Sequence, residues 1–252
     1  MNTSKTHIED CNFKDIQEIL GRKIAVLPWG ACEPHGEQLS YCTDTILATV
    51  IAKEAVSKSK RSDDFMILPA IPFGSQNIGQ FNKKFCIHMS IETQKMILLD
   101  MLRSFSKQLI TTLVIINGHN GNNFKTIVRD LEMQFDIKIY VCNYLDIASK
   151  EFMKTINGAP DVDDHAGFTE TSLMMHYFPD KVHMENLAKN EKEWYPKPNA
   201  EAIWTPRDWD KSSWNTRVGD PRNASAEAGK KIAEHVTDIL AKDLDRITKF
   251  EI

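Results

Sequence analysis

Acidic and imidazole side chains cluster early in the chain. The run Glu33-Pro34-His35-Gly36 is soon followed by Asp44. Glu33 and His35 are two residues apart, so in extended backbone both side chains point to the same side and can meet one ion. A carboxylate at a helix start, as expected for Asp44, is stabilised by free N–H groups and can still bridge two cations. His35 alone could be a loop residue and Asp44 alone a helix cap, but the cluster favours metal binding.

Two later motifs carry the same kinds of side chain. Residues 117–122 (NGHNGN) follow an apolar run, and the glycines beside His119 let the backbone approach a ligand closely, although such pairs also favour simple turns. Residues 163–167 (DDHAG) contain His165 and precede Glu170, which begins an apolar helix. Glu170 could equally be a capping carboxylate in the first helical turn.

Together these motifs offer a mixed set of imidazole and carboxylate ligands. The predicted metal ligands are Glu33, His35, Asp44, His119 and Glu170. This donor set suits Zn²⁺ first, with Mn²⁺ or Fe²⁺ as alternatives, better than Ca²⁺, and it requires no thiolate. Five ligands are many for one catalytic ion that must keep a water. They fit two divalent ions that share a carboxylate and activate one hydroxide at a separation of roughly 3.5–4 Å.

Short apolar runs alternate with segments of helical spacing. The predicted strands are 23–29, 65–71, 111–117 and 137–145, and the main predicted helices are 45–57, 90–105, 124–135 and 224–249. Apolar strands that alternate with helices indicate βαβ units and a mostly parallel sheet. The early cluster and the 117–122 motif each follow a strand, so both should lie at the carboxyl edge, where ligands bind in such sheets.

The longest irregular stretch runs from about 179 to 223. It contains Trp194, Trp204, Trp209 and Trp214. An irregular segment of this length is usually functional. Large amphipathic side chains favour a subunit interface, and an active-site lid is the alternative.

Composition excludes several classes of protein. The 252 residues, 42% of them hydrophobic and 26% charged, suffice for one large α/β domain. A formal net charge of -4 suggests no nucleic-acid or membrane-surface partner. The sequence has no apolar run of about 18 residues and no signal peptide at its start, and its five cysteines contain no CxxC pair. A cytoplasmic protein with free thiols is therefore expected.

In combination, the motifs resemble those of the creatininase (creatinine amidohydrolase) family. The matching segments are 28–36 (PWGACEPHG), 43–44 (TD), 117–122 (NGHNGN), 165–167 (HAG), 170–172 (ETS) and 219–221 (GDP) with Ala224 and Gly229. They occur in family order over most of the chain. The resemblance implies a single three-layer α/β/α domain over residues 1–252, with a mostly parallel sheet and a binuclear metal site that hydrolyses C–N bonds.

The resemblance also assigns roles. Glu33 and His119 would hold one ion, His35 and Glu170 the other, and Asp44 would bridge them. His165 matches the family's catalytic histidine, and Glu170 is the second predicted catalytic residue. Family members form ring-like homo-oligomers, so a hexamer is expected.

The chain also departs from the family pattern. Gln38 and Ser40 stand where a second histidine and a proline often occur, and Gly121 stands where creatininase itself has a ligating glutamate. Glu170 is then the natural source of the missing carboxylate. Residues 156–161 lack the gating tryptophan of true creatininases, so creatinine is not the expected substrate.

The sequence therefore predicts a metal-dependent hydrolase of a small amide, a cyclic amide or a formamide. A metal-bound hydroxide would attack the carbonyl, and His165 would move a proton to the leaving nitrogen. Two alternatives stay open: a metal-bound regulatory protein without turnover, and a metal-dependent phosphoesterase. The second would usually recruit Arg or Lys around the ligands, and Lys125 is the nearest cation in sequence.

Overall fold

A four-stranded parallel sheet forms the centre of the protein, which we describe from a computed structural model for residues 5–187 and 205–248. The strand order is β2-β1-β3-β4. The strands are β1 (Ile24–Trp29), β2 (Phe65–Ile67), β3 (Thr112–Asn117) and β4 (Lys138–Asn143). All pairings are parallel, which confirms the predicted sheet.

Strand β2 is shorter than the predicted 65–71. Leu68 and Ile71 still donate backbone hydrogen bonds to the carbonyls of Val26 and Pro28 on β1. Pro69 between them has no N–H to donate, so the regular ladder stops. Strand β4 also ends two residues early, because residue 144 begins a short helix.

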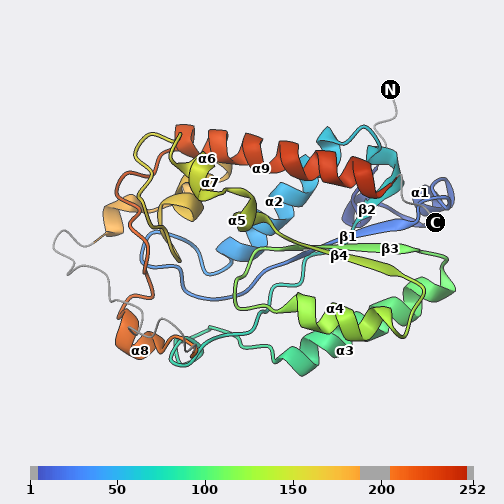
Figure 1. Ribbon diagram of the computed structural model, residues 1–252, viewed down its shortest axis with the longest axis horizontal. Helices are drawn as coiled ribbons and strands as arrows, with labels where there is room; N and C mark the ends of the chain where they lie inside the picture. The colour runs from blue at the N-terminus through green and yellow to red at the C-terminus, as the bar shows by residue number, and fades with distance from the viewer. Residues whose placement is uncertain (1–4, 188–204, 249–252) are drawn as a thin grey trace.

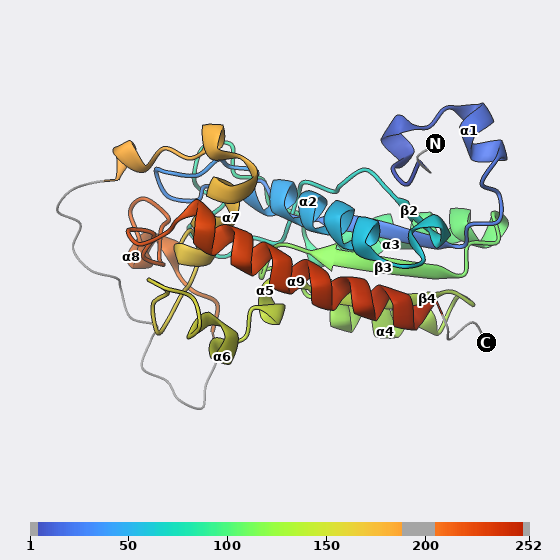
Figure 2. The same ribbon diagram turned by 90° about the horizontal axis from the view of Figure 1, so that it is seen from above.

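Helices cover both faces of the sheet (Figures 1 and 2). One face packs against α2 (Thr43–Lys58), α7 (Phe168–Tyr177) and α9 (Ala226–Ile247), and the other against α3 (Ile91–Lys107) and α4 (Phe124–Glu132). The side chains of each strand alternate between the two cores, so Val26 joins the first and Leu27 the second. The described residues thus form the predicted single three-layer domain.

Short elements complete the chain. They are η1 (Ile8–Asp10), α1 (Phe13–Gln17), η2 (Ser62–Asp64), α5 (Tyr144–Ile147), α6 (Lys150–Met153), η3 (Pro179–Lys181), η4 (Met184–Asn186) and α8 (Trp209–Ser212). The last three lie within the stretch predicted to be irregular. The closing helix begins two residues later than predicted, and its predicted end at 249 lies outside the described residues.

Close packing of α7 on α9 positions the helix that carries Glu170. Gly229 on α9 faces the backbone of Ser172 on α7, and a Cβ atom at Gly229 would lie 1.8 Å from the Ser172 carbonyl oxygen. Only a residue without a side chain allows this approach.

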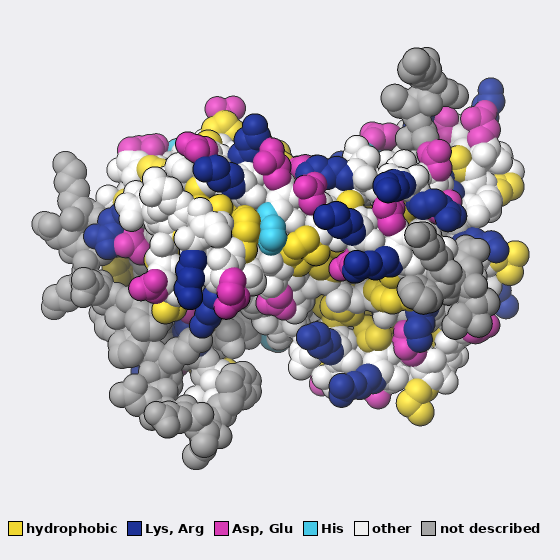
Figure 3. Space-filling model, turned by 45° about the horizontal axis from the view of Figure 1, so that its top comes forward, with side chains coloured by type: hydrophobic (Ala, Val, Ile, Leu, Met, Phe, Trp, Pro, Cys, Tyr) yellow, Lys and Arg dark blue, Asp and Glu magenta, His cyan; other side chains and the backbone are white. Residues whose placement is uncertain are grey.

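Acidic and basic side chains are interspersed on the face shown in Figure 3. A mixed surface of this kind is ordinary for a globular protein. No helix among the described residues is long and apolar enough to cross a membrane.

Candidate metal centre

The predicted site residues meet at the carboxyl edge of the sheet. They come from the loop after β1, the first turn of α2, the loop after β3, the loop before α7 and the first turn of α7. They are Glu33, His35, Asp44, His119, His165 and Glu170. Asp44 is the second residue of α2, as expected for a carboxylate at a helix start. Five of the six are at most 7% exposed, and the side chain of His165 is 12% exposed.

Asp44 lies between two groups of ligand atoms. Its Oδ1 is 2.9 Å from His35 Nε2, and its Oδ2 is 2.9 Å from His119 Nδ1. Glu33 Oε1 is 3.1 Å from the same His119 nitrogen, and Glu170 Oε1 is 3.9 Å from His35 Nε2. Two sets of three side chains, each close enough to hold one ion, therefore share Asp44. This is the grouping that the family resemblance implies.

Backbone carbonyls fix the orientation of all three histidine rings. The oxygens of Glu33, Ser75 and Pro34 lie 3.0, 2.8 and 3.0 Å from His35 Nδ1, His119 Nε2 and His165 Nε2. A carbonyl oxygen can only accept, so these outer nitrogens carry the protons. In the neutral rings the inner nitrogens then present lone pairs to the carboxylates, which is the orientation of metal-ligating histidines.

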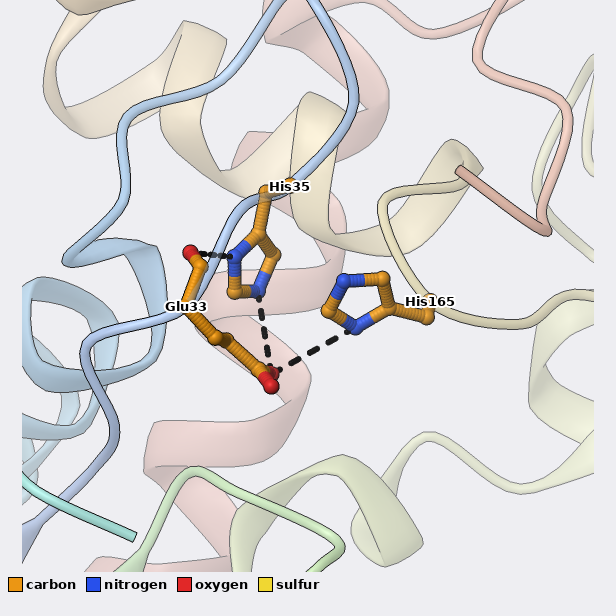
Figure 4. A group of neighbouring side chains, drawn as sticks. All are labelled: Glu33, His35 and His165. Atoms are coloured by element: carbon orange, nitrogen blue, oxygen red, sulfur yellow. Dashed lines mark hydrogen bonds and ion pairs between the residues drawn. The ribbon is translucent and has the colours of Figure 1, made fainter. Parts of the chain in front are cut away.

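His165 completes a third group with Glu33 and His35 (Figure 4). Its Nδ1 is 3.6 Å from Glu33 Oε1, and His35 Nε2 is 3.9 Å from the same oxygen. The two imidazole rings lie 4.2 Å apart between centroids. His165 thus faces the cluster, but it lies farther from the carboxylates than His119 does.

Charges within the cluster shift the pKa values strongly. Burial alone would lower the pKa of His35, but the charge and hydrogen bond of Asp44 raise it to about 10. Burial would also lower the pKa of His119, which Glu33 and Asp44 raise well above its usual value. Burial opposes ionisation of Asp44, yet His35 and His119 hold the pKa of that carboxyl well below its usual range. Without an ion, protons on the histidines balance the carboxylates, and a divalent cation could replace them.

The residues fit a divalent metal centre. Asp44 Oδ2 is buried and, among the described residues, accepts no hydrogen bond, although His119 Nδ1 lies 2.9 Å away without hydrogen-bonding alignment. A buried carboxylate oxygen without a hydrogen bond is costly unless a nearby positive charge offsets its burial, and a divalent cation would supply that charge. The imidazole and carboxylate donors suit Zn²⁺, Mn²⁺ or Fe²⁺.

The loop before α7 is held by its own hydrogen bonds. Asp163 accepts backbone hydrogen bonds from Phe168 at 2.9 Å and Thr169 at 2.7 Å, so this residue caps the helix. Glu170 Oε2 accepts from the Ala166 N–H at 2.7 Å, and Ala166 adopts a left-handed φ of 54°. Glu170 therefore holds the loop before α7 through one oxygen and faces His35 with the other. Burial raises the pKa of Glu170 to about 8, even though the His35 charge opposes this.

Two departures from the family pattern acquire physical explanations. Gln38 is fully buried and donates to the Ala166 carbonyl at 2.8 Å, so it tethers the loop that carries His165. At Gly121 an added Cβ would lie 2.1 Å from the Ser75 carbonyl oxygen and 2.4 Å from His119 Nε2. No side chain fits at position 121 in this conformation, so a glutamate there could not supply a ligand.

Sequence reasoning missed several side chains around the centre. Gln80 donates from Nε2 to Glu33 Oε2, and Arg207 pairs with Asp164 at 2.7 Å. No motif surrounds Gln80 or Arg207 in the sequence. Trp209 is 4% exposed and meets the His165 ring edge-on at 5.0 Å, so it forms a wall of the site.

Among the other tryptophans of the stretch 179–223, Trp214 is 67% exposed. Trp194 and Trp204 lie outside the described residues. Of the tryptophans predicted to form an interface, Trp209 belongs to the site rather than to an open surface.

An open cleft leads to the cluster. It has a volume of about 1370 Å³, and its lining includes Glu33, Asp44, His165 and Glu170 together with Trp209. The carboxylates and His165 are therefore accessible to a ligand from the same side.

Comparison with known proteins identifies the family. The model of the creatininase family, described as creatinine amidohydrolase, matches residues 9–244. The mycofactocin precursor peptide peptidase of Mycolicibacterium smegmatis (strain ATCC 700084 / mc(2)155) is 27% identical over 234 residues, which span 90% of this chain and 85% of that protein.

Solved structures share the fold. A protein of Bacteroides fragilis NCTC 9343, provisionally named a creatinine amidohydrolase, is 34% identical with a TM-score of 0.89, covering 100% of this chain and 99% of its own. A manganese form of creatininase and a Zn–Zn form of a creatininase variant are each 20% identical with a TM-score of 0.80. Both alignments cover 98% of this chain. They cover 100% of the chain of the manganese form and 99% of the chain of the Zn–Zn form.

Proposed function

The chain belongs to the creatininase family of hydrolases, and we propose that it hydrolyses a small amide, a cyclic amide or a formamide with two divalent metal ions. The observation that carries the proposal is the central position of Asp44. Its two oxygens face histidines of two separate ligand groups.

The proposed metal ligands divide between two ions. Glu33 and His119 would hold one, His35 and Glu170 the other, and Asp44 would contact both. When bound, such ions activate a water molecule and stabilise negative charge that develops on the carbonyl oxygen. Zn²⁺ is the first expectation, with Mn²⁺ or Fe²⁺ as alternatives, and the Zn–Zn and manganese forms of solved creatininases support this choice.

His165 is the proposed proton carrier. Burial, and then the charge of His35, lower the pKa of His165, which favours a neutral ring. His165 Nε2 lies 3.0 Å from the Pro34 carbonyl oxygen, which keeps a proton on this nitrogen. Nδ1 is therefore free to accept a proton and deliver it to the leaving nitrogen. Glu170 is proposed as the second catalytic residue because it lines the cleft beside the cluster.

A peptide-type substrate is a second candidate. Pockets for small ligands usually have volumes of about 300–1,000 Å³, and this cleft, at about 1370 Å³, is larger. The relative from M. smegmatis is named for its action on a precursor peptide. An amide within or at the end of a peptide would occupy more of the cleft than a single small ring would.

One experiment tests both forms of the proposal. Protein purified without added metal is analysed for bound elements and then assayed against formamides, cyclic amides, peptide amides and phosphate esters. We expect two ions per chain and hydrolysis of one amide class, detected as a new amino group or ammonia. Hydrolysis of phosphate esters alone would establish the phosphoesterase alternative, and full metal content with no turnover would favour a regulatory protein.

We also propose a homo-oligomer, with a hexamer as the first expectation. Trp214 supports an interface, since a tryptophan that is 67% exposed suits burial against another subunit. A monomeric mass by light scattering at micromolar concentration would refute the assembly.

A further inference from the structure

The two carboxylate oxygens of Glu33 have different partners. Oε1 faces the histidines, at 3.1 Å from His119 Nδ1, 3.6 Å from His165 Nδ1 and 3.9 Å from His35 Nε2. Oε2 instead accepts a hydrogen bond from the side-chain amide of Gln80. The amide therefore determines which oxygen of Glu33 is directed at the histidines.

Gln80 is itself held rigidly. It is 1% exposed, and its backbone N–H donates to the Asn77 carbonyl at 3.2 Å. The turn needs Gly79, which has a left-handed φ of 82° and lies so close to Asp210 that a Cβ there would be 2.6 Å from the Asp210 nitrogen. The backbone N–H of Trp209 donates to the Ile78 carbonyl at 2.9 Å, and this hydrogen bond connects the turn to α8. A buried side chain on a braced turn can fix the orientation of its partner.

Glu170 shows the same division of oxygens by another means. Its Oε2 accepts from the Ala166 backbone N–H at 2.7 Å, while its Oε1 faces His35 Nε2 at 3.9 Å. Both glutamates thus have one oxygen bound by a donor and the other directed at a histidine. For Glu170 the donor is part of the backbone, whereas for Glu33 it is a side chain that substitution can remove.

We propose that Gln80 is a positioning residue for the ion held by Glu33 and His119. This inference rests on the proposed function, since it assumes that Glu33 is a metal ligand. Without the amide, Glu33 Oε2 would be buried without this donor, and the carboxylate could rotate away from the orientation that the histidines require. Loss of such an outer partner typically weakens metal affinity by about 10–100-fold.

The test compares Gln80→Met with Asn82→Ala. Methionine keeps the length of the side chain and removes the donor, and Asn82 is an exposed residue of the same loop. Zn²⁺ affinity is measured by competition with a chromogenic chelator, and the ions per chain are counted by elemental analysis. We expect one ion to bind 10–100-fold more weakly in Gln80→Met and the other to keep its affinity. Asn82→Ala should bind both ions as the unmodified protein does.

Thermal unfolding in EDTA checks the fold, and Gln80→Asn serves as a second variant if methionine is not tolerated. Asparagine keeps the amide but is one methylene too short, so it should weaken the same ion. Unchanged affinity in both variants, or equal weakening of both ions, would overturn the role of Gln80. An unmodified protein that binds two ions but cleaves no amide would refute the proposed function and leave the result for Gln80 standing.

Discussion

Two parts of the candidate metal centre are held in place by different kinds of structure. The sheet-edge half, Glu33 and His119, follows strands β1 and β3, which are neighbours in register as far as the pair Trp29 and Asn117. The helix half, His165 and Glu170, lies in and after a loop whose position depends on the packing of α7. A backbone ladder thus places the first pair, whereas side-chain packing between helices places the second.

This difference predicts different sensitivities. A change near the sheet-edge half should disturb its ligands while the rigid sheet keeps the fold. A change behind the helix half should act through the fold and reach the ligands indirectly. Asp44 belongs to neither half, because its two oxygens face His35 and His119, which belong to two different ligand groups.

The largest effect is expected from Asp44→Ala, which removes the group shared by both halves. The remaining ligands would form two incomplete sets, so both ions should be lost together with activity. Elemental analysis of the purified variant measures this, and circular dichroism checks that it folds. If one ion is retained at full occupancy, Asp44 does not bridge the two.

The next effect separates chemistry from metal binding within the helix half. His165→Ala should keep both ions, because His165 Nδ1 lies 3.6 Å from Glu33 Oε1, farther than the corresponding nitrogen of His119. Turnover should fall by about 10²–10⁴-fold, as is typical when a general acid–base group is removed.

Metal occupancy and rate are measured on one preparation of His165→Ala, with His183→Ala as the control, since the His183 side chain is exposed and pairs with Glu185 rather than with the cluster. Depletion of metal in His165→Ala would make this residue a ligand. Unchanged turnover would remove it from the reaction.

The sheet-edge half could be predicted from the sequence because strand ends are recognisable. An apolar run that stops at Trp29 or Asn117 locates the carboxyl edge, and the polar residues that follow must lie there. The shortened β2 was not foreseen in full, although Pro69 and its missing N–H explain it. The four parallel strands followed from the alternation of apolar runs and helical spacing, whereas the two helical layers were implied by the family resemblance.

The helix half and the outer contacts were harder to predict. Spacing alone could not decide whether Glu170 has a structural role or faces a metal site, and in the structure one oxygen accepts from the Ala166 N–H while the other faces His35. Gln80 contacts Glu33, which lies 47 positions away in the sequence, and no motif surrounds Gln80. Such contacts depend on the path of a loop, which local periodicity does not specify.

Gly121→Ala should break the sheet-edge half selectively. The new Cβ would lie 2.4 Å from His119 Nε2 and 2.1 Å from the Ser75 oxygen that orients this ring. His119 would have to turn, so the ion shared with Glu33 should bind roughly 10–100-fold more weakly, as for other losses of ligand orientation. Chelator competition measures the affinity of each ion. Equal weakening of both ions would show that the two halves are not independent.

The smallest effect on the centre is expected from Gly229→Ala, which acts behind the helix half. A Cβ at this position would lie 1.8 Å from the Ser172 carbonyl oxygen, far inside van der Waals contact, so α9 and α7 must separate. Overpacking of this kind costs about 1–3 kcal/mol. For a chain of this size each kcal/mol lowers the midpoint of thermal unfolding by about 2–4 °C. Gly21→Ala is the matched control, because nothing lies within 4 Å of a Cβ there.

We expect Gly229→Ala to unfold at a lower temperature than Gly21→Ala in EDTA. We also expect the ion held by His35 and Glu170 to bind slightly more weakly, while the ion held by Glu33 and His119 keeps its affinity. If the Glu33 ion weakened as much as the other, helix packing would control both halves, and the sheet edge would not hold its ligands independently.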